Sequence, residues 1–489
     1  MKFQHDAKLL INGELVAAEG GRVFDTINPA TEDVIAQAPD ASVADVERAI
    51  GGARAAFDEG TWATDPAFRS HCLHQFSKAM RDDLEELRAL TVAEVGSPLS
   101  LTYSAQLDGP VAVLEYYADL AGIYQWTTDL GLAQTQMGMH RRWTEREPYG
   151  VVSAISAYNF PTQLNLAKLA PALAAGCTVV LKGAPDTPLI TLALGRLIAE
   201  HTDIPAGVVS VLSSSEVATG AVMTTDPRVD MVSFTGSTQV GRTIMAASSP
   251  TLKKCFLELG GKSAFVVLDA ESLPLSAMFC SFAVGAHSGQ GCAITSRLVV
   301  PRALLDEAVD HVKATMAGLK VGNPSDPTNY MGPLINARQR DKVQGYVDGA
   351  IADGATVACG GGRPADLDKG FFFEPTLIVG ADENSAIAQD EIFGPVMVLL
   401  PHDGDDDAVR IANNSIFGLS GAVNAADHDR AVAVGRRIRS GTMSINGGMY
   451  YSPDGPFGGY KQSGYGREMG TPGLEEFLQI KTFAEPGPK

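Results

Sequence analysis

The sequence predicts an α/β protein of two or more domains, built on a parallel sheet with helices on both faces. The first observation is length, because 489 residues exceed the size at which one hydrophobic core usually stops growing. The second is an alternation of short apolar runs with segments of helical spacing, which begins at Val151. The third is an ordinary globular composition, with 45% hydrophobic and 19% charged residues. We therefore expect a chain that is folded throughout.

The first 150 residues predict short strands followed by helices. Turns are expected at Asn12-Gly13 and Gly20-Gly21, between the short strands. A helix is expected after Ser42, because Ser42 and Asp45 have the spacing of a capping box. Further helices are predicted over 67–95 and 105–124, and the alternation over 135–149 indicates a strand.

From Val151 the pattern predicts repeated strand–helix units. The expected strands are 151–155, 178–181, 208–212, 231–234 and 255–259, and the expected helices are 164–173, 189–198, 215–223 and 239–247. Such units form a parallel sheet that is covered on both faces. Ligands bind such sheets at the carboxyl ends of the strands. The loops 157–161, 182–186 and 235–237 should therefore share one crevice.

A second α/β region is predicted from about residue 263 to residue 463. Its expected helices are 275–285, 304–317 and 338–353, and its expected strands are 298–300 and 397–400. From about Pro472 the apolar positions alternate, which predicts an edge or arm strand.

Charge and composition exclude several classes of partner. The net charge is −19, and no basic cluster suggests binding to nucleic acid. No segment has the length and apolarity of a secretory leader or a membrane span, so we expect a cytoplasmic protein without a membrane partner. The nine histidines form no ligand-spaced cluster, so no metal site is expected. Reduced thiols are the simplest account of six scattered cysteines: Cys72, Cys177, Cys255, Cys280, Cys292 and Cys359.

Cys292 is the cysteine whose surroundings best suit a nucleophile. It lies in HSGQGCAITSR, where Gly289 and Gly291 leave room around the sulfur. A cysteine nucleophile must be partly exposed and activated, whereas buried cysteines are inert. Cys177 and Cys255 lie in or beside apolar strands and are predicted to be core residues. A structural role remains the alternative for Cys292 taken alone.

Three further segments have a functional and a structural interpretation. Glu258, at the end of an apolar strand, is either a surface residue or a buried base. Asn159 is either a turn residue or a hydrogen-bond donor into the crevice. The segment 234–241 is either an ordinary turn or an anion site at a helix start, and it lacks the GxGxxG pattern.

Together, eight motifs resemble those of the aldehyde dehydrogenase superfamily in sequence and in order. They are SAYNFP (156–161), VVLKG (179–183), FTGSTQVG (234–241), LELGGKS (257–263), GQGC (289–292), EIFGPV (391–396), INGG (445–448) and PFGGYKQSG (456–464). The resemblance spans nearly the whole chain. It implies a Rossmann-like cofactor domain (1–126 and 149–260), a catalytic domain (261–463) and a small β oligomerisation arm (127–148 and 472–489). It also implies a homodimer or homotetramer, since an unpaired arm strand needs a covering subunit.

The resemblance also implies the chemistry. Cys292 would attack an aldehyde, the Asn159 amide and the Cys292 backbone N–H would stabilise the oxyanion, and Glu258 would activate water to hydrolyse the thioester. The implied cofactor is NAD, with NADP as the alternative. The residues that the resemblance assigns to it are Lys182 at the adenosine ribose, Gly236, Ser237 and Gly241 near the pyrophosphate, and Leu259, Glu391 and Phe393 nearer the nicotinamide.

Two departures from the family pattern bear on specificity. Pro185 stands where many members have a glutamate that disfavours NADP, and Asp186 could replace part of that discrimination. Ala167 stands where members with a narrow tunnel carry a bulky aromatic residue, and Gly291 precedes the nucleophile. These small residues predict a wide pocket for a medium or bulky apolar aldehyde, such as an aromatic, terpenoid or longer aliphatic one.

Three alternatives to a hydrolytic dehydrogenase remain. A CoA-acylating dehydrogenase typically lacks the general-base glutamate, which is present here as Glu258. A cysteine esterase or hydrolase needs a histidine base, and only His287 lies near Cys292, where a pocket-wall role is the simpler interpretation. A catalytically silent relative is disfavoured because Cys292, Glu258 and Asn159 are all retained.

Overall fold

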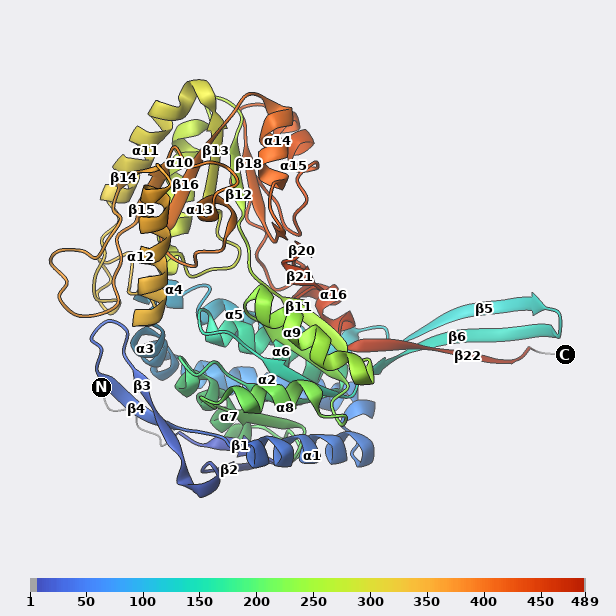
Figure 1. Cartoon of the computed structure of the whole chain (residues 1–489). Coiled ribbons are helices and arrows are strands. Elements are labelled where there is room, and N and C mark those ends of the chain that lie inside the picture. The colour runs from blue at the N-terminus through green and yellow to red at the C-terminus, as the bar shows by residue number, and fades with distance from the viewer. Residues whose placement is uncertain (1–6, 488–489) are drawn as a thin grey trace.

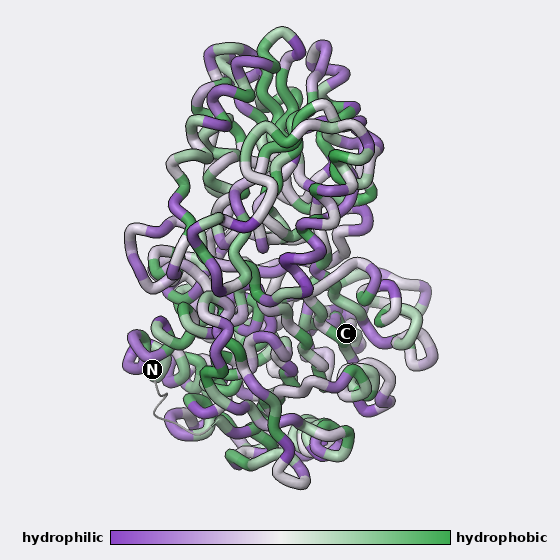
Figure 2. Tube along the Cα trace, turned by 60° about the vertical axis from the view of Figure 1, so that its left-hand side comes forward, coloured by the Kyte–Doolittle hydropathy of each residue, from purple (hydrophilic) through white to green (hydrophobic). Residues whose placement is uncertain are grey.

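The computed structural model describes residues 7–487 and consists of two α/β bodies and a projecting β arm (Figure 1). We call residues 7–126, 149–260 and 464–477 the lower body and residues 261–463 the upper body. The arm consists of residues 127–148 and 478–486. Hydrophobic segments gather in the interior of both bodies, whereas hydrophilic segments lie mainly along the outer loops (Figure 2).

The lower body is built around an eight-stranded sheet in the order β2-β1-β9-β8-β7-β10-β11-β21. Its strands are β1 (Leu9–Ile11), β2 (Glu14–Val16), β7 (Val151–Ile155), β8 (Thr178–Lys182), β9 (Val209–Leu212), β10 (Met231–Thr235), β11 (Lys254–Glu258) and β21 (Gly464–Tyr465). A separate hairpin pairs β3 (Val23–Ile27) with β4 (Val34–Pro39). Its helices are α1 (Val43–Glu59), α2 (Pro66–Asp82), α3 (Leu84–Val95), α4 (Leu99–Thr102), α5 (Asp108–Ile123), α6 (Pro161–Ala175), α7 (Pro188–His201), α8 (Val217–Thr225), α9 (Thr238–Ser248) and α16 (Gly470–Glu475).

The upper body contains a seven-stranded sheet in the order β14-β15-β16-β13-β12-β18-β19. Its strands are β12 (Ala264–Val267), β13 (Arg297–Pro301), β14 (Thr356–Cys359), β15 (Thr376–Val379), β16 (Val396–His402), β18 (Gly421–Asn424) and β19 (Ser444–Ile445), with β17 (Phe417–Gly418) and β20 (Tyr460–Lys461) paired separately. Its helices are α10 (Leu273–Gly285), α11 (Leu305–Ala317), α12 (Ala337–Ala352), α13 (Ala386–Gln389), α14 (Asp405–Asn413) and α15 (His428–Gly435). Short 3-10 turns cover Glu19–Gly21, Trp62–Thr64, Ser249–Thr251, Ala286–Gly289 and Arg302–Leu304.

The predicted parallel sheet is confirmed. Strands β9, β8, β7, β10 and β11 pair in parallel, with β7 paired to both β8 and β10. The strand order therefore reverses direction at β7, which is where ligands bind such sheets. The loops after β7, β8 and β10 adjoin at this edge, as the sequence predicted; for example, Ser156 N donates to Lys182 O at 3.2 Å.

Local signals in the N-terminal part are largely confirmed. Asn12 and Gly13 turn between β1 and β2 with φ of 54° and 83°, the left-handed pair of a tight hairpin. The capping box of α1 is present: Asp45 N donates to Ser42 Oγ at 3.1 Å, and Ser42 N donates to Asp45 Oδ2 at 2.9 Å. The helical region predicted over 67–95 is confirmed and consists of two helices, because Asp83 separates α2 from α3.

The arm is a three-stranded antiparallel sheet in the order β22-β6-β5, made of β5 (Thr127–Thr135), β6 (Gly138–Pro148) and β22 (Leu478–Pro486). Trp143 and Phe483 stack across two of its strands with ring centroids 5.1 Å apart. The strand predicted from about Pro472 is wrong in its first residues, because α16 extends to Glu475 and β22 begins only at Leu478. In the described part of the chain, no helix has the length and apolarity to cross a membrane.

Glu94 joins α3 to the start of α7 and is completely buried. Its two carboxyl oxygens accept hydrogen bonds from Leu189 N at 2.6 Å and from Ile190 N at 3.0 Å, which satisfies backbone donors of the first turn of α7. Burial raises the pKa of Glu94 to about 8.

We expect the stability of the fold to decrease between pH 5 and pH 8 through Glu94. The folded state holds the proton more tightly than the unfolded state, so the stabilisation is complete below the unfolded pKa and is lost as pH rises through about 8. Glu94→Gln should flatten this part of the profile of melting temperature against pH. Glu94→Leu should lose about 2–4 kcal/mol near pH 5, because two buried N–H groups lose their acceptor, and its difference from the wild type should shrink as pH rises toward 8. An unchanged profile in Glu94→Gln would contradict this account.

Candidate active site

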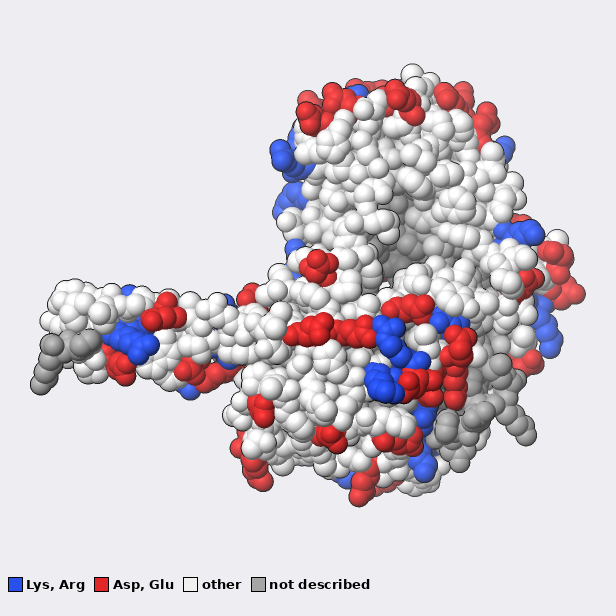
Figure 3. All heavy atoms as spheres, turned by 180° about the vertical axis from the view of Figure 1, so that it is seen from behind, with Lys and Arg blue, Asp and Glu red and all other residues white. Residues whose placement is uncertain are grey.

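A crevice lies where the two bodies meet, at the carboxyl ends of β7, β8, β10 and β11. In the view from behind, the surface is hollowed at this junction and is bordered mostly by uncharged atoms (Figure 3). The bodies approach closely at Gly260 and Gly261. A Cβ on Gly260 would lie 2.4 Å from Glu391 Oε2, and one on Gly261 would lie 2.4 Å from Cys292 O. Only glycines allow this approach, which brings together the LELGG, GQGC and EIFGP motifs.

Asn159 points at the segment that leads to Cys292. Asn159 Nδ2 donates to Gln290 O at 2.9 Å, and Asn159 O accepts from Gln106 Nε2 at 2.8 Å. Gln290 is itself fixed, because its Oε1 accepts from Ile335 N at 2.9 Å and its Nε2 donates to His287 O at 3.2 Å. Buried contacts therefore hold the Asn159 amide against Gln290, two residues before Cys292.

The loop that ends at Cys292 (residues 287–292) has an unusual backbone. His287, Ser288 and Gly289 have φ of 47°, 54° and 73°, so three successive residues occupy the left-handed region. A Cβ on Gly289 would lie 2.0 Å from Gly394 O, so no other residue fits there. Such strained segments persist only where the surrounding structure holds them.

Cys292 is half-buried, whereas Cys177 and Cys255 are buried, as the sequence predicted. Burial raises the pKa of the Cys292 thiol well above its ordinary value, and the negative charges of Glu258, Glu391 and Glu468 raise it further. The thiol is therefore neutral at physiological pH, and a neighbouring base must take its proton when it attacks.

Glu258 is buried at the end of β11, with 1% of its surface exposed. Burial raises the pKa of Glu258 well above its ordinary value, the charge of Glu468 raises it further, and the charge of Lys168 opposes both effects. Among residues 7–487, neither carboxyl oxygen of Glu258 has a hydrogen-bond partner at normal distance. A buried carboxyl group beside a thiol, without a structural partner, has the properties of a general base.

A buried ion pair behind Glu258 was not predicted from the sequence. Lys168 Nζ lies 3.2 Å from Glu468 Oε1 and donates to Thr235 Oγ1 at 2.7 Å. Both charged side chains are almost fully buried. One signal was available: Lys168 is the only charged residue in the otherwise apolar and amide-bearing α6, every residue of which is buried.

Lys182, at the end of β8, was predicted to face the adenosine ribose. Its Nζ donates to Ser214 O at 3.0 Å, and burial lowers its pKa to about 8, an effect that the charge of Asp40 opposes. Asp40 is held by Ser214 Oγ at 3.1 Å and by Ser215 N at 2.9 Å. Asp186 instead accepts a hydrogen bond from Asn336 Nδ2 at 2.9 Å, which turns it toward the start of α12. Asp40, missed in the sequence, is thus the carboxylate that acts on Lys182.

The turn between β10 and α9 contains the predicted cofactor residues Gly236 and Ser237, and the third, Gly241, lies in the first turn of α9. Ser237 caps α9, with its Oγ accepting from Val240 N at 3.3 Å. A Cβ on Gly236 would lie 2.4 Å from the Phe234 ring, and one on Gly241 would lie 2.7 Å from the Leu259 side chain. Gly241 therefore allows the predicted residue Leu259 to pack under the helix start.

The loop with Glu391 and Phe393 is held from both sides. Gly261 N donates to Glu391 Oε1 at 2.9 Å, and Tyr158 packs edge-on against Phe393 with centroids 5.9 Å apart. From α12, Lys342 Nζ donates to Glu391 O at 3.1 Å. Burial raises the pKa of Glu391, while the Gly261 N–H and the Lys342 charge oppose this.

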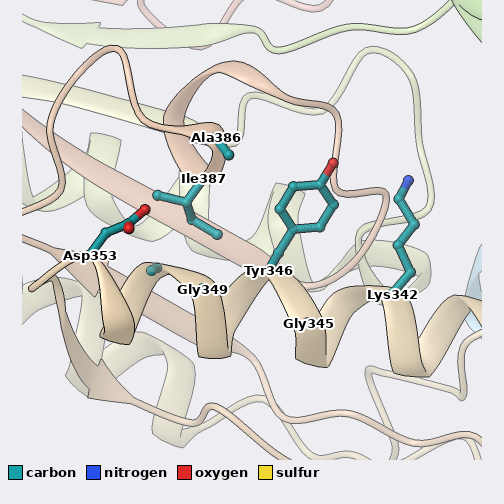
Figure 4. A pocket seen from close by; sticks show the side chains of 8 residues that line it. Lys342, Gly345, Tyr346, Gly349, Asp353, Ala386 and Ile387 are labelled. Carbon is teal, nitrogen blue, oxygen red and sulfur yellow. The ribbon is translucent and has the colours of Figure 1, made fainter.

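Helix α12 contributes residues that the sequence analysis missed. Gln339 Nε2 donates to Ile392 O at 3.0 Å and to Phe393 O at 2.8 Å. Figure 4 shows Lys342 and Tyr346 along α12 with Ile387 of α13 opposite, in a groove with an empty volume of about 560 Å³. This groove lies behind the Glu391 loop, so α12 supports the loop rather than lining the crevice at Cys292. Within the described residues, no group of His, Cys, Asp and Glu side chains is arranged to hold a metal ion.

Comparison with known proteins gives a consistent result. A model of the aldehyde dehydrogenase family matches residues 15–483. Aldehyde dehydrogenase 1 of Tanacetum cinerariifolium is 37% identical over 98% of this chain and 95% of its own length. The 3-succinoylsemialdehyde-pyridine dehydrogenase of a Pseudomonas species is 37% identical over 96% of this chain and 97% of its own length.

Solved structures agree with the sequence comparison. An aldehyde dehydrogenase of Mycobacterium tuberculosis complexed with NAD+ superimposes with a TM-score of 0.93 at 40% identity, covering 97% of both chains. A betaine aldehyde dehydrogenase of Staphylococcus aureus in complex with NAD+ has a TM-score of 0.94 at 33% identity, covering 99% of this chain and 97% of that one.

Separating the Lys168–Glu468 pair should destabilise the protein strongly. Lys168→Met leaves the buried Glu468 without its counter-charge, which should cost about 3–5 kcal/mol of unfolding free energy. In Lys168→Met/Glu468→Leu no charge is left unpaired, so most of that loss should be recovered. Denaturant unfolding of both variants measures the difference. A double variant at least as unstable as Lys168→Met would show that the pair is not the source of the effect.

Proposed function

The chain belongs to the aldehyde dehydrogenase family, and on this premise we propose that it oxidises an aldehyde to the carboxylic acid with NAD+ and water. The observation that carries the proposal is the placement of the buried Glu258 carboxyl group beside the thiol of the half-buried Cys292, with which it interacts. Asn159 completes the set, since its amide is held at the nucleophile loop.

The first step is attack by the Cys292 sulfur on the aldehyde carbon. Glu258 takes the thiol proton, and the carbonyl oxygen becomes an oxyanion in a thiohemiacetal. The Asn159 amide and the Cys292 backbone N–H are positioned to donate to this oxygen. Loss of one such donor typically lowers the rate ~10²–10³-fold.

The second step converts the thiohemiacetal to a thioester and then to the acid. NAD+, when bound, accepts the hydride that leaves the former aldehyde carbon. Glu258 first releases to solvent the proton that it took from the thiol, and it then takes a proton from water, whose oxygen attacks the thioester carbon. The thiolate of Cys292 leaves, the acid departs, and the proton returns to the sulfur through Glu258 or solvent. Glu258 thus serves as the base in both halves of the reaction.

The residues of the crevice fit an NAD cofactor. Gly260 and Gly261 leave the space beside Glu391 that a Cβ would fill, and the start of α9 presents backbone N–H groups at the carboxyl end of β10. We propose that Lys182 contacts the adenosine ribose, that Gly236, Ser237 and Gly241 form the pyrophosphate side, and that Leu259, Glu391 and Phe393 hold the nicotinamide end.

We propose that Asp40 supplies the preference for NAD over NADP. Pro185 removes the usual carboxylate, and Asp186 is turned away toward Asn336. Asp40 opposes the lowering of the Lys182 pKa, which means that its negative charge acts at the Lys182 ammonium. A ribose 2′-phosphate bound by Lys182 would meet this charge and be repelled.

The substrate that we propose is a medium or bulky aldehyde with a largely apolar frame. Ala167 and Gly291 support it, because both are small and Gly291 lies near the aromatic ring of Phe160. The ring of Phe160 lies 3.8 Å from where a Cβ of Gly291 would be. A wide, aromatic-walled pocket favours such a frame.

The alternatives are less well supported by the same geometry. An esterase would need His287 as a base, but burial lowers the pKa of His287 to about 4, and neither ring nitrogen has a partner at normal hydrogen-bond distance among the described residues. His287 packs on Phe160 with ring centroids 5.2 Å apart, as a pocket-wall residue would. A CoA-acylating enzyme would have no use for Glu258 as a water-activating base.

We propose that the arm mediates assembly into a homodimer or homotetramer. Its two outer strands, β5 and β22, each have one unpaired edge within this chain. The apolar side chains Leu130, Leu132, Met137, Met139 and Ile480 are exposed on it. An exposed apolar strand is a liability unless another subunit covers it. The division into cofactor domain, catalytic domain and arm is proposed with the boundaries given above.

Substitution of Glu258 should slow both halves of the reaction. Glu258→Gln should lower steady-state NADH production about 10²–10⁴-fold, because no positioned base takes the thiol proton or the water proton. An external thiolate replaces only the activated water, so added 2-mercaptoethanol should raise the turnover of this variant in part. Cys292→Ala should produce no NADH with or without the thiol. Cys359→Ala, at the other half-buried cysteine, is the control and should retain wild-type turnover. NADH production by Cys292→Ala would refute the proposed mechanism.

Removal of the Asp40 charge should change the cofactor preference. Asp40→Asn should raise the ratio of kcat/KM for NADP to that for NAD by about tenfold, which corresponds to ~1.4 kcal/mol of lost repulsion. Asp186→Asn is the matched control and should leave the ratio unchanged. Absorbance of the reduced nicotinamide with either cofactor measures both. A larger shift in Asp186→Asn than in Asp40→Asn would assign the discrimination to Asp186 and contradict the proposed role of Asp40.

A further inference from the structure

Gln163 is a buried polar residue that the mechanism above does not use. It is the third residue of α6, and only 3% of its surface is exposed. Among residues 7–487, neither its amide oxygen nor its amide nitrogen has a hydrogen-bond partner. Leaving a buried polar group unpaired costs about 1–3 kcal/mol. A ligand that pairs with this amide would recover that cost.

The position of Gln163 on α6 places it on the side of the nucleophile loop. Residues three and four apart on a helix share one face, so Gln163 lies on the face that carries Phe160 and Ala167. The Phe160 ring packs on His287 and lies 3.8 Å from the position of a Cβ on Gly291. This face of α6 therefore looks onto the segment that ends at Cys292. Gln163 is about one helical turn, roughly 5 Å, beyond the Asn159 backbone.

The residues next to Gln163 on this face are small or apolar. Ala167, one turn further along α6, is small and fully buried, and Gly291 has no side chain. The neighbouring face residue Phe160 is apolar and aromatic. Gln163 is thus the one side chain on this stripe of α6 that can form a directed hydrogen bond.

Resting on the proposed function above, we propose that Gln163 selects aldehydes that carry one hydroxyl or carbonyl group on an otherwise apolar frame. The primary amide has a donor and an acceptor, so it can pair with either group. The group should lie about 5 Å from the aldehyde carbon, the separation of Gln163 from the oxyanion donor. A site with a buried hydrogen-bonding group rejects an analogue that leaves this group unpaired, whereas an added methylene is discriminated weakly.

Matched pairs of substrates test this assignment. In 3- and 4-hydroxymethylbenzaldehyde a hydroxyl replaces the terminal methyl of 3- and 4-ethylbenzaldehyde, with almost no change in shape. For the wild-type protein, kcat/KM should be roughly 10–100-fold higher for the hydroxymethyl member of at least one pair. Gln163→Leu keeps the size of the side chain and should abolish or invert this ratio.

Two controls distinguish selection from a structural role. Thr162→Val changes a buried hydroxyl on the adjacent face of α6 without a change in size, and it should leave the ratio as in the wild type. The melting temperature of Gln163→Leu should be equal to or above that of the wild type, because an unpaired amide is replaced by an apolar group. A lower melting temperature with an unchanged substrate ratio would overturn the proposal and indicate a structural glutamine.

The remaining outcomes separate this inference from the proposed function. Oxidation of all four aldehydes, with the same ratio in wild type and Gln163→Leu, would overturn the role of Gln163 and leave the dehydrogenase activity established. Absence of NADH production from a broad panel of aldehydes, while NAD+ still binds, would overturn the proposed function itself and the assignment of Gln163 with it.

Discussion

The arrangement of the crevice depends on one close backbone contact, between Gly260–Gly261 at the junction of the two bodies and the upper-body loops that contain Cys292 and Glu391. The Gly261 N–H donates to Glu391, and the missing side chain of Gly261 leaves room for the carbonyl of Cys292. Because Glu258 lies two residues before Gly260, the same contact fixes the placement of Glu258 relative to Cys292. A single methyl group at either glycine would push apart Glu258, Cys292 and Glu391.

The second constraint is electrostatic. Glu258, Glu391 and Glu468 all act on Cys292, and each of them raises the pKa of its thiol. This arrangement opposes a permanent thiolate and would protect the sulfur from reaction before a substrate arrives. Lys168 is the buried cation that offsets part of this negative charge, which explains why a charged residue is kept inside α6. In the proposed mechanism, activation of the thiol would therefore depend on transfer of a proton to Glu258 rather than on a pre-formed thiolate.

The sequence predicted the parallel sheet, the shared edge of the loops after β7, β8 and β10, and the burial of Cys177 and Cys255, because each follows from local periodicity. It did not predict Lys168 with Glu468, or Asp40 with Lys182. These partners are 300 and 142 residues apart in the chain, and no local pattern records such a distance. Asp186 was considered because it is next to Pro185, yet its side chain faces α12. Gln163 was overlooked because an amide near a helix start is common, and its significance depends on finding it buried without a partner.

The left-handed turn at His287–Gly289 is held from a direction that does not pass through the crevice. Ser288 Oγ donates to Gly332 O at 2.6 Å, and Gly332 packs so tightly on Gly96 at the end of α3 that a Cβ there would lie 2.0 Å from Gly96 O. The loop that ends at Cys292 is therefore held, through Gly332, against the C-terminal end of α3 in the lower body. A chimaera that joined the lower body of one relative to the upper body of another would take the Cys292 loop from one parent and the end of α3 that supports it from the other. Recombination between the two sheets would therefore separate Cys292 from the contact at Gly96 that holds its loop.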